Sequence, residues 1–130
     1  NADMQQPIKG GAVNPQRQHR EERLLIIEKT YDMLKYADQC VTQFPKKERY
    51  RTATGIMQCA WNLMDLFLEA RYPEYRVAAL RRADIELDKL RYKIRFVMDL
   101  TFLPFKKYEN LASMVDEIGR MLGAWKKRLK

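Results

Sequence analysis

Four stretches of this chain repeat apolar residues at spacings of three and four, which places those side chains on one face of an α-helix. No stretch shows the alternation typical of a strand. Pro45 is expected to end the first helix, Pro73 to open the third and Pro104 to end it. The residues expected to face inward are Leu24, Ile27, Tyr31, Leu34, Val41 and Phe44, then Ala53, Ile56, Ala60, Leu63 and Phe67, then Val77, Leu80, Leu87, Leu90, Ile94 and Val97, and finally Tyr108, Leu111, Val115, Ile118, Leu122 and Trp125. Because short connections make neighbouring helices antiparallel, the sequence predicts an all-α, up-down-up-down four-helix bundle.

The chain has 130 residues, enough for one domain with a modest core. Residues 1–20 contain two prolines and two glycines but few large apolar groups, so they are expected to form a flexible arm or a cloning remnant. Residues 21–130 are expected to form the bundle. No run approaches roughly 18 apolar residues and no secretion signal is present, which favours a cytoplasmic protein without membrane contact.

Residues that could carry catalysis are few. The single histidine, His19, lies in the expected arm, and the only serine, Ser113, lies in a helix without a nucleophile elbow. Cys40 and Cys59 lack partners at zinc-ligand spacing and are expected to pack in the core. With no phosphate-binding glycine loop either, the sequence predicts neither an enzyme nor a cofactor.

Two pairs of carboxylates lie one helical turn apart, as in dimetal sites, namely Asp84 with Asp88 and Asp65 with Glu69. The bundle-type di-iron pattern also needs histidines, which these helices lack, and arginines surround the first pair. A charged surface therefore explains both pairs better than a metal site does.

The formal net charge of +8 favours an anionic partner, most often a nucleic acid. The charge is concentrated late, with about −2 over residues 21–44 and about +4 over residues 105–130. A face that merely keeps a basic domain soluble is the alternative. The cations expected to bind nucleic acid are Arg71, Arg76, Arg82, Lys89, Lys93, Lys106, Lys107, Lys126, Lys127 and Arg128.

A second set of residues is expected to serve packing, between helices or between subunits. Gly119 and Gly123 each cost roughly 1 kcal/mol in a helix, so a close approach by another backbone would explain them. Trp125 lies on the apolar stripe beside them. A stripe of mixed charge on the third helix is expected to form salt bridges within the helix or to a neighbouring subunit, and consists of Asp84, Asp88, Arg91 and Arg95.

Two segments, IIEKTYDMLKYADQCVTQFPKKERY at residues 26–50 and YENLASMVDEIGRMLGAWKK at residues 108–127, resemble the accessory variability determinant, Avd, of diversity-generating retroelements. This family belongs to a wider group of four-helix bundles that includes proteins encoded in intervening sequences of 23S ribosomal RNA. The FPKKERY turn is shared across the group, whereas GRMLGAWKK favours Avd. The resemblance covers about residues 24–128.

The resemblance implies a basic, barrel-shaped homopentamer without catalytic activity. Such a protein would bind the reverse transcriptase of the same retroelement and its template RNA, with cDNA as a further candidate ligand. It would thereby support mutagenic cDNA synthesis. The alternative function is that of an intervening-sequence-type bundle, acting as a protein–protein adaptor.

Overall fold

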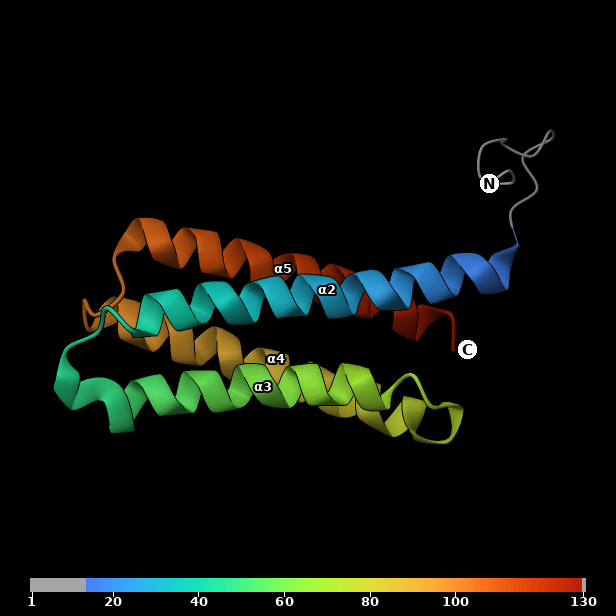
Figure 1. Cartoon of the computed structure of the whole chain (residues 1–130), viewed down its shortest axis with the longest axis horizontal. Helices are drawn as coiled ribbons and strands as arrows, with labels where there is room; N and C mark the ends of the chain where they lie inside the picture. The colour runs from blue at the N-terminus through green and yellow to red at the C-terminus, as the bar shows by residue number, and fades with distance from the viewer. Residues whose placement is uncertain (1–13, 130) are drawn as a thin grey trace.

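The computed structural model describes residues 14–129, and this part of the chain forms four long α-helices and no strand. The helices are α2 (Pro15–Val41), α3 (Thr54–Glu69), α4 (Arg76–Asp99) and α5 (Phe105–Lys127). Each contacts two others, because α2 lies beside α3 and α5, and α4 also lies beside both. Successive helices run in opposite directions (Figure 1). The predicted antiparallel four-helix bundle is confirmed.

The core contains the predicted faces of three helices. Every residue expected to point inward from α3 is buried, and so is every such residue of α5 except the half-buried Tyr108. Phe67 of α3 stacks on Trp125 of α5 with ring centroids 6.5 Å apart, which joins opposite corners of the bundle. On α4, Val77 is exposed and the other predicted residues are buried. Burial of this apolar surface is the main force that holds the four helices together.

The beginning of α2 differs from the prediction. Pro15–Arg20 continue the helix instead of forming an arm, while residues 1–13 lie outside the described range. The reason is a cap: the Asn14 side-chain oxygen accepts a hydrogen bond from the Gln16 amide at 2.9 Å, and Pro15 occupies the first helical position. The composition of residues 1–20 concealed this start signal.

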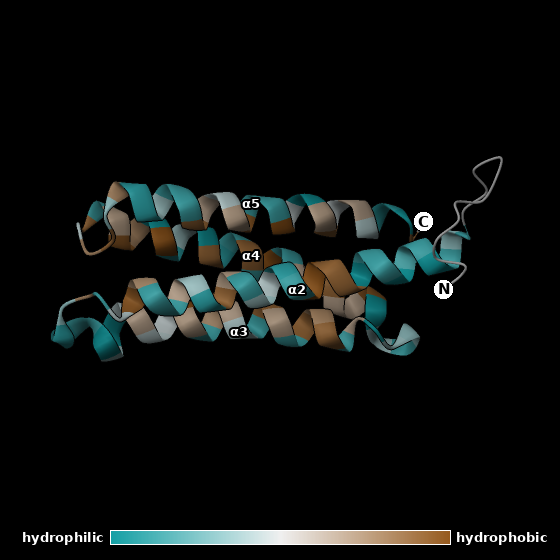
Figure 2. Cartoon of the chain, turned by 45° about the horizontal axis from the view of Figure 1, so that its top comes forward, coloured by the Kyte–Doolittle hydropathy of each residue, from teal (hydrophilic) through white to brown (hydrophobic). Residues whose placement is uncertain are grey.

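The buried face of α2 is also offset from the predicted one. Leu24 and Tyr31 are about half exposed, and the buried residues are Ile26, Thr30, Met33, Leu34, Ala37 and Cys40. Thr30 can enter the core because its hydroxyl donates a hydrogen bond of 2.7 Å to the Ile26 carbonyl. Leu24 and Leu25 consequently lie exposed on the surface of α2. Hydrophilic and hydrophobic residues alternate along the ribbon of this helix (Figure 2).

Each connection begins before the proline expected to mark it. Helix α2 ends at Val41, and Phe44 packs from the connection against Phe102 with ring centroids 6.1 Å apart. A 3₁₀ turn, η2 (Lys46–Glu48), and a π-helical turn, η3 (Arg49–Ala53), then lead into α3. Another 3₁₀ turn, η4 (Pro73–Tyr75), precedes α4.

The connection from α4 to α5 corrects one further prediction. Helix α4 ends at Asp99, five residues before Pro104, and Pro104 instead precedes the first residue of α5. The chain turns at Thr101, whose φ of 69° lies in the left-handed region. A β-branched residue is rarely found there.

Candidate nucleic-acid interface

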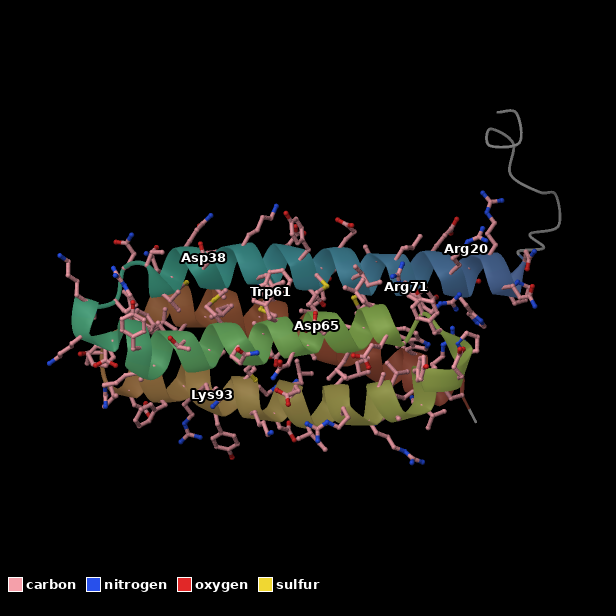
Figure 3. The ribbon with its side chains drawn as sticks, turned by 60° about the horizontal axis from the view of Figure 1, so that its bottom comes forward. Arg20, Asp38, Trp61, Asp65, Arg71 and Lys93 are labelled. Carbon is pink, nitrogen blue, oxygen red and sulfur yellow. The ribbon has the colours of Figure 1, made fainter. Side chains whose placement is uncertain are left out.

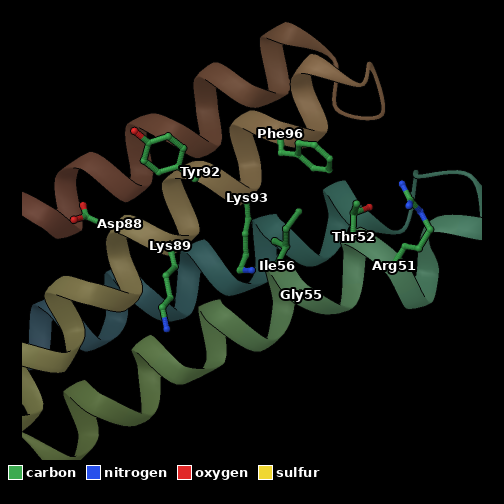
Figure 4. Close-up of a pocket in the computed structure, with 9 residues that line it drawn as sticks. All are labelled: Arg51, Thr52, Gly55, Ile56, Asp88, Lys89, Tyr92, Lys93 and Phe96. Atoms are coloured by element: carbon green, nitrogen blue, oxygen red, sulfur yellow. The ribbon is translucent and has the colours of Figure 1, made fainter.

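A groove between α4 and the start of α3 combines cations with exposed aromatic rings. It has a volume of about 700 Å³. Lys89 and Lys93 extend from α4 toward α3 (Figure 4), and the Lys93 ammonium passes Gly55, where a Cβ atom would lie 3.9 Å from it. The lining residues are Arg51, Thr52, Gly55, Ile56, Asp88, Lys89, Tyr92, Lys93 and Phe96.

Two of the cations on this face are anchored by a buried carboxylate. The Glu86 side chain is almost fully buried and lies 3.5 Å from an Arg82 nitrogen and 3.6 Å from the Lys89 ammonium. The Asn62 amide, 3.4 Å away, also donates a hydrogen bond to it. Burial alone would raise the pKa of Glu86, but hydrogen bonds from Cys59 and Asn62 and the charges of Lys89 and Arg82 hold it below its ordinary value. Glu86 is therefore an anion that orients Arg82 and Lys89.

Cys59 forms the inner boundary of this arrangement. Its thiol lies 3.2 Å from the Glu86 carbonyl oxygen and 3.4 Å from the Glu86 carboxylate. Burial, the hydrogen bond to Glu86 and the negative charge of Glu86 raise the pKa of Cys59 to about 12. A thiol with so high a pKa is a poor nucleophile near neutral pH. Cys59 and the equally buried Cys40 are packed in the core, as predicted.

A second buried carboxylate orients the cation at the other end of the groove. Glu48 contacts the Arg51 guanidinium at 3.0 Å and accepts a hydrogen bond from the Thr52 hydroxyl at 2.8 Å. Burial would raise the pKa of Glu48, but these two side chains lower it overall. The acid of the FPKKERY turn thus holds Arg51 at the groove.

The aromatic side chains at the groove are open to solvent. Tyr92 has a relative exposure of 71% and Phe96 of 53%, and both come from α4 beside Lys93. Exposed rings next to cations are typical of surfaces that bind single-stranded nucleic acid, where bases stack and phosphates pair with the cations. Among residues 14–129, Lys93 forms no ion pair, so its charge is available to a ligand.

A family model described as bAvd-like matches residues 24–129. The chain belongs to the bAvd-like family. This membership confirms the resemblance to the accessory variability determinant of diversity-generating retroelements. A search of curated proteins found no match. No helix within the described residues is long and apolar enough to cross a membrane.

In this bAvd-like chain the predicted cations do not form one continuous surface. Lys89 and Lys93 line the groove, and Arg82 lies two turns earlier on α4, where it contacts Glu86 as Lys89 does. Lys106 and Lys107 lie at the start of α5, near the connection from α2 to α3. The remaining predicted cations lie at the opposite end of the bundle and are Arg71, Arg76, Lys126, Lys127 and Arg128. Two of them form ion pairs, since Lys126 pairs with Asp84 and Arg128 pairs with Glu22 at 2.7 Å.

The stripe of mixed charge forms its salt bridges within this one chain. Arg91 contacts Asp88 at 3.2 Å and Asp116 of α5 at 3.6 Å. Arg95 lies 4.0 Å from Asp99, and Asp84 pairs across to α5. The contacts of Arg91 with Asp88 and of Arg95 with Asp99 lie within α4, which is one alternative of the sequence prediction. The other two contacts join α4 to α5, which the prediction did not include.

The two glycines of the bAvd-like ending have different surroundings. A Cβ atom on Gly119 would lie 2.7 Å from an Arg91 nitrogen and 3.2 Å from a Leu87 methyl carbon, so side chains occupy this space. A Cβ atom on Gly123 would meet nothing within 4 Å. The expected approach of another backbone is therefore wrong within this chain, because α4 reaches α5 through its side chains.

Sequence reasoning missed four cations that the structure brings into hollows. Arg51 lines the groove, whereas Arg17, Arg20 and Arg23 line a hollow at the far end of the bundle. Arg51 lies where the second helix is expected to open, and the sequence alone does not show that this turn faces α4. The three arginines recur every three residues after a capping Asn-Pro pair, and this pattern could have revealed a basic helical start.

Proposed function

We propose that this bAvd-like protein is a noncatalytic accessory subunit that binds nucleic acid and the reverse transcriptase of a diversity-generating retroelement. In that role it supports mutagenic cDNA synthesis from template RNA. Family membership carries the proposal, since the match spans residues 24–129. The groove supplies a physical basis for the nucleic-acid part.

The groove is suited to a single strand of RNA. Lys93 lies next to Tyr92 in the sequence, and both line the same groove as Phe96. A phosphate can pair with the ammonium while bases stack on exposed rings, and stacking is worth about 1–3 kcal/mol per base. Lys89, which also lines the groove, lies 3.6 Å from the Glu86 carboxylate, and this contact lessens the ordering needed when a phosphate approaches.

The proposal includes assembly into a homopentamer. Exposed apolar residues on the outer surface of α4 support it, because Val77 and Ile85 are each nearly half exposed and follow the helix toward Phe96. Exposed apolar side chains can form part of an interaction site when another subunit covers them. Light scattering should give a mass near five times 15.6 kDa, and a monomer or dimer would contradict the assembly.

The nucleic-acid part is tested by Lys93→Ala, which removes a cation without leaving a buried carboxylate unpaired. We expect weaker binding of a short oligouridine and a salt dependence whose logarithmic slope is smaller by about 0.7. The matched control is Lys35→Ala, an exposed lysine on α2 outside the groove. Equal affinity of wild type and Lys93→Ala, with unchanged helicity, would show that the groove does not bind the strand.

The same apolar surface on α4 favours a second candidate function, that of a protein–protein adaptor. The two functions differ in their response to salt. Phosphate contacts weaken steeply as salt rises, whereas an apolar contact changes little. Co-purification with the reverse transcriptase of the same element at low and high salt separates them, provided that RNA is removed by nuclease in a parallel sample. Support of cDNA synthesis is tested separately, by measuring whether the reverse transcriptase makes more cDNA from template RNA when this protein is added.

A further inference from the structure

A cluster of arginines lines a hollow of about 610 Å³ at the end of the bundle opposite the connection from α2 to α3. Three come from the first turns of α2, Arg71 comes from the connection between α3 and α4, and Arg76 is the first residue of α4. Arg20 and Arg71 mark its two sides in Figure 3. No carboxylate lines the hollow, whose residues are Asn14, Gln16, Arg17, His19, Arg20, Arg23, Arg71, Pro73 and Arg76.

The positive charge of this hollow is largely uncompensated. Arg17 has an acidic partner, Glu21, at 3.4 Å, and both side chains are exposed. Within residues 14–129 the other four arginines of the hollow form no ion pair. Burial lowers the pKa of Arg23, and the charges of Arg76, Arg128 and Arg20 lower it further. An anion in the hollow would relieve this repulsion.

One of these arginines is already held in place. The Arg76 guanidinium donates hydrogen bonds of 2.7 Å to the carbonyl oxygens of Ala70 and Arg71, which directly follow α3. Arg71 in turn donates to the Leu68 carbonyl at 3.2 Å. Guanidinium groups that are fixed before binding lose less side-chain entropy when they pair with a phosphate.

We propose that this arginine cluster binds successive phosphates of a nucleic-acid strand, at a site separate from the groove between α3 and α4. The inference rests on the proposed function and adds to it a second, sequence-independent contact. A strand suits the hollow because one continuous ligand brings one charge per nucleotide, whereas a single small anion would leave most of the arginines unpaired. Three of these arginines precede residue 24, where the family match begins, so the site does not follow from family membership.

The test compares two double variants of α2 that each remove two positive charges. Arg20→Gln with Arg23→Gln alters the cluster, and Lys29→Gln with Lys35→Gln is the matched control elsewhere on the helix. Binding of a fluorescent oligouridine is measured by anisotropy over a series of salt concentrations, and helicity is checked by circular dichroism. The cluster variant should reduce the slope of log affinity against log salt by about 1.4. Between about 50 and 200 mM salt, its affinity should therefore fall by a factor about sevenfold smaller than that of the wild type.

The control variant should change the slope by much less than the cluster variant. Equal changes in both would overturn the inference, because they would show a response to net charge alone. An unchanged slope in the cluster variant would also overturn it. These outcomes differ from failure of the proposed function, in which the wild-type protein would bind no RNA at all.

Competition experiments identify the source of the phosphate. At equal phosphate concentration, unlabelled oligouridine should displace the fluorescent strand better than tripolyphosphate does. Stronger displacement by tripolyphosphate would assign the hollow to a free polyphosphate and overturn the inference. Polyglutamate that displaces the strand as well as oligouridine does would assign the hollow to an acidic protein segment, with the same consequence.

Discussion

Gly123 provides a sharp test of how α5 contacts its surroundings. Glycine in a helix interior destabilises by roughly 0.5–1 kcal/mol relative to alanine, and a Cβ atom at Gly123 would meet nothing within 4 Å. Gly123→Ala should therefore raise the free energy of unfolding by about 0.5–1 kcal/mol and the melting temperature by roughly 2–4 °C. Gly119→Ala is the matched comparison. Its Cβ atom would displace the Arg91 guanidinium, 2.7 Å away, and crowd the Leu87 methyl carbon at 3.2 Å.

The changes that the two variants cause in the free energy of unfolding should therefore differ in sign or size. In Gly119→Ala the gain in helix propensity is offset by the disturbed contact between Arg91 and Asp116, a solvent-exposed pair worth about 0–1 kcal/mol. The assay is thermal unfolding followed by circular dichroism at several protein concentrations, because assembly makes the midpoint depend on concentration. A lower midpoint for Gly123→Ala at all concentrations would refute the reasoning. If Gly123 lies against a second copy, Gly123→Leu should lower the mass in light scattering while helicity remains.

Two further predictions concern stability. Because the pKa of Glu86 is lowered in the folded state, the stabilisation due to its charge is present above the ordinary pKa of 4.5 and is lost as the pH falls through the folded pKa. In urea unfolding, the free energy of unfolding should therefore fall less at acidic pH in Glu86→Gln than in wild type. An equal fall in both proteins would contradict the charged state assigned to Glu86. Thr101→Gly should raise the free energy of unfolding by about 1 kcal/mol, since its φ of 69° suits glycine better than a β-branched residue, and a lower value would show that the threonine side chain stabilises the turn.

Regular apolar spacing allowed buried faces to be predicted, whereas burial that depends on a particular hydrogen bond could not be. The faces of α3 and α5 could be predicted because their apolar spacing is regular and few polar residues interrupt it. The face of α2 could not, since the burial of Thr30 depends on a hydrogen bond within the helix and the start at Pro15 depends on the Asn14 cap. Likewise, Arg82, Lys89 and Lys93 could be placed on one face by spacing alone. The burial of Glu86 required a partner on another helix.

Two basic surfaces with different chemistry should contribute different parts of RNA affinity. At the groove, Lys89 shares the buried Glu86 carboxylate with Arg82, which lies outside the lining. The exposed rings of Tyr92 and Phe96 add stacking that depends little on salt. The lining of the arginine hollow contains no carboxylate and no Phe, Tyr or Trp, and His19 is its one ring of stacking type. Counterion release should therefore dominate at the hollow, so the salt slope reports mainly on the arginines, whereas affinity remaining at high salt reports mainly on the rings.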